Sequence, residues 1–282
     1  MGHFLYEGHR IEYDSYGEGD RVVVLVHGLL MNRRMYERLG PTLAERGYRA
    51  ICVDLLGHGR SDRPADLRLY SMRLFSRQVA ALIDHLGFDS AVVGGTSLGA
   101  NVALELAVHD PKKAKALFIE MPVLDNALPG VVATFGPAML GLRWARPAFE
   151  VIARASSFIP RTNFVIDIGL DWARQSPGPS LAVLEGLLLG ETAPHREERR
   201  TIDHPTLIVG HHRDPLHPFS DSGMLIEELP NSVLIEADSI VEWRVRPKRL
   251  DAGLVAFLDE IWAAAPARSP AGPPHAHDGT TA

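Results

Sequence analysis

The sequence predicts a doubly wound α/β fold, with a mostly parallel sheet and an inserted helical cap. Short β-branched apolar runs alternate with segments of helical periodicity, and one long segment, 122–200, interrupts this alternation without strand-like runs. Strands that alternate with helices form βαβ units, which pair in parallel and place helices on both faces of the sheet. At 282 residues, the chain suits one large domain of this kind with an insertion.

The first part of the chain supplies the edge and the centre of the predicted sheet. Residues 3–16 alternate loosely and are expected to form a hairpin of two short strands at the sheet edge, and 17–20 is expected to be a turn. The continuous run at 21–26, RVVVLV, is typical of a strand buried on both faces. Further strands are expected at 48–53, from Ala91 and at 116–121, with helices at about 33–46 and 71–86 and over the segment VALELAVHD.

The second part of the chain contains the predicted cap and the rest of the sheet. Strand character returns at 206–210 and 232–236, with helices expected at about 219–229 and 247–263. Within the cap, helical pieces are expected to be broken by six prolines, namely Pro129, Pro137, Pro147, Pro160, Pro177 and Pro179. We therefore assign 1–121 and 201–263 to the core, 122–200 to the cap and 264–282 to a disordered tail rich in Pro, Gly and Ala.

Composition excludes several classes of protein. The net charge of −6, from 29 basic and 35 acidic residues, argues against a nucleic-acid partner and against an anionic membrane surface. No apolar run approaches the 18 or so residues that a membrane span needs, and no signal-peptide pattern opens the chain. The single cysteine, Cys52, lies in an apolar run and is expected to be buried. We therefore expect a soluble cytoplasmic protein.

A Gly-x-Ser-x-Gly turn joins the strand from Ala91 to the next helix. At so tight a turn, the Ser97 side chain stands clear of both elements, and the helix directs its N-terminal N–H groups at whatever the serine attacks. Gly95 and Gly99 suit this turn because a Cβ at either position would clash. The arrangement indicates a nucleophilic serine.

Several segments together resemble the α/β-hydrolase superfamily. They are VVLVHGLL, DLLGHGRSD, GGTSLG, PTLIVGHHRDPLHP and RPKRLDAGLVAFLDEI, in the order that the family has them, and they cover roughly residues 5–121 and 201–263. The resemblance implies that Ser97 is the nucleophile and that the backbone N–H groups of Leu29 and Leu98 form the oxyanion hole. It also implies that Asp214, just after a strand, is the acid, and that His27 supports its loop rather than acting in catalysis.

The catalytic base is absent from its usual place. Family members carry it in the loop after the last strand, where this chain has Ser239-Ile240, and no histidine occurs between His217 and the tail pair His275 and His277. His217 is one possible base, although Asp214 then lies close to it in sequence, which favours Asp125 as the acid. Alternatively, Ser97 acts with Glu242 or with a water molecule. A third possibility is that the Gly-x-Ser-x-Gly turn, or elbow, has only a structural role, in a protein that binds a ligand without catalysis.

The sequence predicts no metal site and no cofactor. His211, His212, Asp214 and His217 could be drawn as ligands, but a catalytic metal normally draws its ligands from several elements. The expected function is a serine hydrolase that acts on an ester, or a related small apolar acyl substrate, through an acyl-serine intermediate. The alternative is a catalytically impaired protein of the same fold that binds a small hydrophobic ligand.

Overall fold

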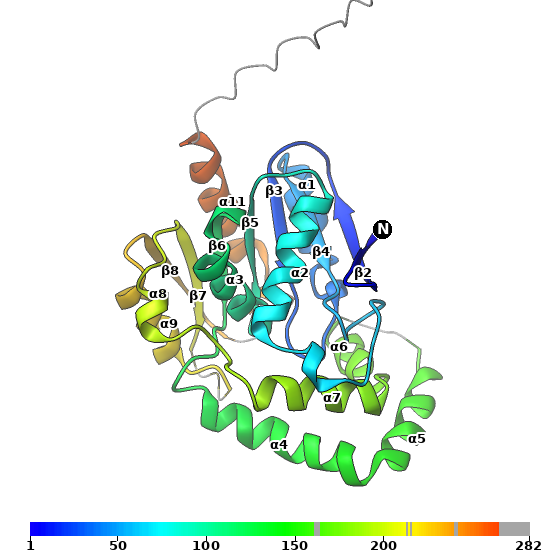
Figure 1. Ribbon diagram of the computed structural model, residues 1–282. Helices are drawn as coiled ribbons and strands as arrows, with labels where there is room; N and C mark the ends of the chain where they lie inside the picture. Colours follow the sequence, from blue (N-terminus) through cyan, green and yellow to red (C-terminus); the bar gives the residue numbers. More distant parts are fainter. Residues whose placement is uncertain (161–163, 213, 215, 240–241, 265–282) are drawn as a thin grey trace, which may run out of the picture.

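The computed structural model describes residues 1–160, 164–212, 214, 216–239 and 242–264. At its centre is an eight-stranded sheet with the order β1-β2-β4-β3-β5-β6-β7-β8 (Figure 1). β1 and β2 form the predicted antiparallel hairpin at the edge, β2 pairs antiparallel with β4, and the remaining neighbours are parallel. The strands are β1 Gly2–Tyr6, β2 His9–Tyr16, β3 Val22–Val26, β4 Arg49–Val53, β5 Ala91–Thr96, β6 Ala114–Glu120, β7 Thr206–His211 and β8 Ser232–Ala237.

Helices cover both faces of the sheet, which confirms the doubly wound fold. Alternate side chains of β3 enter two separate cores, with Val22, Val24 and Val26 in one and Val23 and Leu25 in the other. The first core contains residues of α2 (Met72–His85), α3 (Leu98–His109) and α9 (Phe219–Glu228), and the second those of α1 (Leu39–Glu45) and α11 (Lys248–Ala263). Cys52 is fully buried in the second core, as expected.

Two sequence expectations about helices were wrong in detail. The helix expected at 33–46 is a 3-10 turn, η1 (Arg33–Tyr36), followed by the separate helix α1. Pro41 explains the break, because its ring would clash with the carbonyl of residue 37 in a continuous helix, whereas the first turn of a helix tolerates it. Pro137, expected to break a helix, lies inside α4 (Leu128–Trp144).

The segment predicted to be the cap is helical, and Figure 1 places α4, α5 and α7 beyond one end of the sheet. The helices after α4 are α5 Arg146–Ser157, α6 Phe164–Ala173, α7 Pro177–Leu188 and the single turn α8 Arg196–Arg199. Shorter turns elsewhere are η2 Leu67–Leu69, η3 Pro111–Lys113 and α10 Glu242–Val245. Within the described residues, no helix has the length and apolar character that crossing a bilayer requires. The expected disordered tail, apart from Ala264, lies outside the described residues.

Candidate active site

The turn between β5 and α3 holds Ser97 in a strained backbone conformation. Its φ is 55° and its ψ −107°, a region that L-residues rarely adopt. A Cβ built on Gly95 or on Gly99 would lie 1.9 Å from the carbonyl oxygen of Val26, so the neighbouring strand can approach only if both positions are glycine. The local sequence therefore forms the tight elbow that presents the serine side chain.

Three side chains from two loops meet at this elbow. His217 Nε2 lies 2.9 Å from Ser97 Oγ, and His217 Nδ1 lies 2.9 Å from Asp214 Oδ2. The other carboxylate oxygen of Asp214 accepts the backbone N–H groups of Leu216, at 2.8 Å, and His217, at 3.0 Å. The loop after β7 thus curls around Asp214, and this curl turns the imidazole toward Ser97. Asp214 and His217 are only three residues apart, and from the sequence this spacing seemed too short for the carboxylate to orient the imidazole. The turn of the loop brings the two side chains into contact.

The Asp214 carboxylate stays ionised in this arrangement. Burial would raise its pKa, but the hydrogen bond and charge of His217, together with the two backbone N–H groups, hold the pKa below its ordinary value. An ionised Asp214 favours the tautomer in which Nδ1 carries the proton and donates to the carboxylate, so that the Nε2 lone pair faces the Ser97 hydroxyl. This is the tautomer that a general base at Nε2 requires.

The other candidate acids are engaged elsewhere. The Asp125 side chain is 70% exposed and lies 4.0 Å from the Arg199 guanidinium. Glu242 forms an ion pair with Arg249 at 2.8 Å and accepts the backbone N–H of Asp238. Both carboxylates thus have partners outside the site, whereas the Asp214 carboxylate contacts His217 directly.

The segment after β8, where the family places its histidine, is tied to the core through an arginine. Arg244 lies 2.8 Å from the buried carboxylate of Glu120 and donates to Thr96 Oγ, the residue just before Ser97. His211 faces the same carboxylate at 3.3 Å and binds the Ser239 carbonyl through Nδ1. Ile240, which replaces the family's histidine, lies outside the described residues.

The loop after β3 carries Leu29, whose backbone N–H is the first expected oxyanion donor. Hydrogen bonds of the buried His27 hold this loop in place. His27 is fully buried, and burial lowers its pKa, so the ring is neutral. Its Nε2 accepts the N–H of Leu55 at 3.2 Å, and its Nδ1 donates to the Gly28 carbonyl at 2.8 Å. Both contacts fit the supporting role that the resemblance implied for His27.

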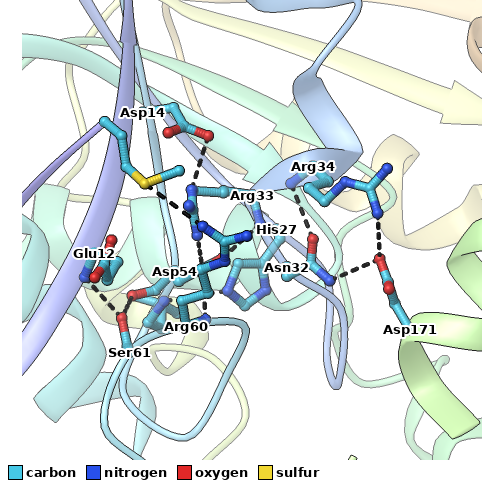
Figure 2. Close-up of polar contacts among 12 residues, drawn as sticks. Glu12, Asp14, His27, Asn32, Arg33, Arg34, Asp54, Arg60, Ser61 and Asp171 are labelled. Atoms are coloured by element: carbon cyan, nitrogen blue, oxygen red, sulfur yellow. Dashed lines mark hydrogen bonds and ion pairs between the residues drawn. The ribbon is translucent and has the colours of Figure 1, made fainter. Parts of the chain in front are cut away.

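A buried ion pair holds the continuation of the same loop. Figure 2 shows Arg33 between Asp14 and Asp54, and Asp54 Oδ1 accepts the Arg33 backbone N–H at 2.7 Å. Asp54 also accepts the backbone N–H of Arg60, from the loop after β4. This carboxylate therefore joins two loops at the carboxyl ends of neighbouring strands, which is a structural role.

An apolar pocket of about 430 Å³ opens beside the serine. Leu29 and Leu98, the two expected oxyanion residues, line it together with Ser97 and His217. The remaining lining residues are Met72, Asn101, Val123, Val131, Phe135, Leu187, Leu188, Thr192 and Leu216. The apolar runs VVATFGPAMLGL and LAVLEGLLLG of the predicted cap suggest a hydrophobic pocket from the sequence, and they supply Val131, Phe135, Leu187 and Leu188. Met72, Asn101 and Leu216, which lie outside the predicted cap, have no such signal in the sequence.

No metal centre accompanies these residues. Across the residues that the structure describes, no group of three or more His, Cys, Asp or Glu side chains is arranged to hold a metal ion. His211 and His212, which share the loop with Asp214, point to different partners, since His212 stacks on Phe219 and lies 3.0 Å from Glu236.

Known proteins similar to this chain include several enzymes. A curated relative from Aeromonas hydrophila, a pimeloyl-[acyl-carrier protein] methyl ester esterase, is 29% identical over 85% of this chain and 95% of its own length. A putative non-heme haloperoxidase of Mycobacterium phage D29 is 26% identical over 90% of this chain and 92% of its own length. An enol-lactonase from Burkholderia xenovorans LB400 superposes with a TM-score of 0.75 at 19% identity, over 92% of this chain and all of that one.

These relatives support a hydrolase. The family model described as alpha/beta hydrolase fold matches residues 21–178, which is more than half of the chain and includes both the His27 loop and the Ser97 elbow. The sheet order, the elbow and this match agree, and the chain belongs to the α/β-hydrolase fold family.

Proposed function

We propose that this protein hydrolyses an ester or a related acyl compound with a small apolar acyl group, through an acyl-Ser97 intermediate. The observation that carries the proposal is the continuous contact from Asp214 through His217 to Ser97, with 2.9 Å at each step. A serine hydroxyl is a weak nucleophile, and a positioned base with an orienting carboxylate is what activates it.

The proposed reaction has two halves. In the first, His217 Nε2 takes the Ser97 proton as Oγ attacks the substrate carbonyl, and the backbone N–H groups of Leu29 and Leu98 stabilise the oxyanion. His217 then gives that proton to the leaving alcohol. In the second half, His217 takes a proton from water, the resulting hydroxide attacks the acyl-serine, and the free acid leaves while Ser97 recovers its proton.

The lining of the pocket supports an apolar acyl group. Nine of its thirteen lining residues are Leu, Val, Met or Phe, and the acyl chain of a substrate would bury its surface against them. The Asn101 side chain, although polar, bonds the Val123 and Thr192 carbonyls and so has no free donor for a charged substrate group. The name of the Aeromonas relative, an esterase, agrees with this substrate class.

A fluorophosphonate probe tests the nucleophile and the base together. We expect covalent label on Ser97 and hydrolysis of p-nitrophenyl esters by the wild type, and neither by Ser97→Ala. His217→Ala should lower turnover by about a hundredfold or more, the usual size of a general-base contribution. His212→Ala is the matched control, because His212 lies on the same loop but contacts Phe219 and Glu236, and it should change turnover less than threefold.

The outcomes separate this proposal from the ligand-binding alternative. Absence of both label and turnover in the folded wild type would contradict the hydrolase and favour a catalytically impaired binder. If the wild type is labelled and active, but His217→Ala and His212→Ala have the same turnover, Ser97 remains the nucleophile and His217 is excluded as its base.

A further inference from the structure

A second recess lies away from Ser97, between the core and the cap. It is larger than the pocket beside Ser97 and shares no lining residue with it. Core loops and the end of α6 build it together, and Figure 2 shows part of the wall, with Arg33, Arg34, Arg60 and Asp171. Besides these four, the lining residues are Met1, Asp14, Tyr16, Asn32, Glu37, Asp54, Gly59, Arg63, Arg174 and Gln175.

Two of the five arginines in this wall form ion pairs, each with two of its carboxylates. Arg33 contacts Asp14 at 2.8 Å and also pairs with Asp54. Arg34 lies 3.2 Å from Glu37 and 3.5 Å from Asp171. These pairs account for all four carboxylates that line the recess, so the other three guanidinium groups face it without a carboxylate from the same wall.

Arg63 is the most enclosed of these three cations. Its Nε donates to the Gly57 carbonyl at 3.3 Å and its NH2 group to Gln175 Oε1 at 2.5 Å, so both partners are neutral. Burial lowers the pKa of Arg63, and the charges of Tyr70 and Asp54 offset this effect only in part. An anion in the recess would supply the missing counter-charge.

Arg174 and Arg60 add two further cations to the same wall. Arg174 donates to the Ser156 carbonyl at 2.9 Å, and Arg60 NH1 lies 3.6 Å from the Met1 sulfur. In the part of the chain that the structure describes, no carboxylate lies within 4.0 Å of the charged nitrogens of Arg60, Arg63 or Arg174. Arginine forks bind phosphate and carboxylate groups in a bidentate manner, which suits such a wall.

We propose that this recess binds a small polyanion, a molecule with two or more phosphate or carboxylate groups, through Arg60, Arg63 and Arg174. Arg33 and Arg34 hold all four carboxylates of the wall, which leaves three positive charges, on Arg60, Arg63 and Arg174, whereas a chloride carries only one negative charge. A polyanion can instead engage the three uncompensated guanidinium groups at once, and the space is large enough for it.

Binding would connect the cap to the core beside the oxyanion loop. Arg174 and Gln175 follow α6 of the cap, whereas Arg60 and Arg63 belong to the loop after β4. Gln175 also donates to the carbonyl of Leu30, the neighbour of Leu29. A polyanion held by Arg63 and Arg174 therefore bridges two parts of the molecule, and it should stabilise the folded protein in proportion to its occupancy.

Isothermal titration calorimetry on the full chain tests this proposal with inorganic pyrophosphate and citrate, each against sodium chloride of matched ionic strength. We expect one or both polyanions to bind and to raise the Tm, while chloride does neither. Binding of pyrophosphate alone assigns phosphate groups to the ligand, and binding of citrate alone assigns carboxylates. The double variant Arg63→Gln/Arg174→Gln should weaken binding at least tenfold.

Two further variants keep the test decisive. Arg60→Gln removes an exposed guanidinium that holds no buried partner, so it should fold normally and still weaken binding at least threefold. Arg154→Gln is the matched control, because Arg154 is exposed on α5 and lies outside the recess, and it should leave binding unchanged. The proposal is overturned if the wild type binds neither polyanion, or if Arg60→Gln binds as tightly as Arg154→Gln.

Discussion

At the scale of single residues, Asp214 performs two tasks with its two carboxylate oxygens. One oxygen accepts two backbone N–H groups and so fixes the turn of the loop, while the other faces His217 Nδ1. One short loop carries both Asp214 and His217, the acid and the base that we propose. The arrangement works because the backbone contacts set the direction of the imidazole.

Asp214→Asn should separate these two tasks. The amide oxygen can still accept the backbone N–H groups, but the charge that favours the correct His217 tautomer is lost. We expect kcat for a p-nitrophenyl ester to fall by about 10²- to 10⁴-fold while the protein stays folded. Asp125→Asn is the control for the alternative acid and should change kcat less than threefold. Equal effects of the two substitutions would argue against Asp214 as the orienting group.

The glycines of the elbow give a prediction on stability. Gly95→Ala would place a Cβ 1.9 Å from the Val26 carbonyl, so two central strands would have to separate. We expect the free energy of unfolding in urea to fall by about 3 kcal/mol. Gly223→Ala, in α9, has open space around the new methyl group and should raise it by about 0.5–1 kcal/mol. A tolerated Gly95→Ala would mean that the strands can adjust.

At the scale of elements, α3 and β6 each carry a buried carboxylate, and both elements adjoin the elbow. Glu105 lies on α3, two turns beyond Ser97, and only 4% of its surface is exposed. Glu120, at the end of β6, is fully buried and forms an ion pair with Arg244 of the segment after β8. Glu120 therefore pairs with an arginine next to the elbow, whereas Glu105 lies farther along α3.

Glu105→Gln should stabilise the protein at alkaline pH. Burial raises the pKa of Glu105 to about 7, although His109 Nε2 lies only 3.3 Å away, so burial outweighs that contact. The folded state keeps this proton between the ordinary pKa and about 7, so the free energy of unfolding falls as pH rises through that window.

The measurement is the difference in unfolding free energy between Glu105→Gln and the wild type, as a function of pH. Glutamine has no charge to bury, so the variant should exceed the wild type in unfolding free energy at pH 8 and approach it near pH 4.5, close to the ordinary pKa of glutamate. Urea unfolding at both pH values measures this. A constant difference between the two proteins would mean that Glu105 does not titrate in the expected window.

Arg244→Met tests the contact that ties the segment after β8 to β6. Burial would raise the pKa of Glu120, but Arg244 and His211 hold it down at about 2, so the carboxylate is charged when folded. Removing Arg244 leaves that charge underpaired, and we expect a loss of about 3–5 kcal/mol of unfolding free energy. Glu120→Gln/Arg244→Met should recover much of the loss in the same urea assay, whereas additive losses would mean that the two residues act separately.

At the scale of the whole molecule, the side chains of Asn101 and Asp221 hold the segment that we propose as the cap. Asn101 on α3 exchanges hydrogen bonds with the backbone of Val123 and also donates to the Thr192 carbonyl, so it contacts both ends of the segment proposed as the cap. Asp221 on α9 accepts backbone N–H groups that follow Val123, namely those of Leu124, Asn126 and Ala127. The cap is thus anchored next to the proposed catalytic serine.

Asn101→Ala should loosen the cap without unfolding the core. Two carbonyls and one N–H would lose buried partners, at a cost of about 1–3 kcal/mol. We expect limited proteolysis to cut within 122–200 several-fold faster than in the wild type, with the sheet still detectable by circular dichroism. Asn126→Ala is the control, because Asn126 is exposed and contributes only its backbone N–H. Equal cleavage rates would exclude Asn101 as the anchor.

The sequence by itself determined the order of strands and helices, because strand and helix periods and apolar runs are local properties of the chain. It also determined the elbow, since only glycine fits where Val26 approaches Gly95 and Gly99. The sequence left the catalytic base open among several choices. It also missed the break before α1 and the continuity of α4 around Pro137. Whether a proline is tolerated depends on where the helix begins and on its tertiary surroundings, which the local sequence does not specify.

Only the tertiary structure brought His217 to Ser97, across 120 positions of sequence. The direction of the imidazole depends on how Asp214 turns its loop, and on how β5 and β7, separated by β6 in the sheet, align their carboxyl ends. The pocket likewise combines core residues with cap residues that no local pattern relates. Spacing along the chain cannot specify such contacts, because they depend on the packing of elements that are distant in sequence.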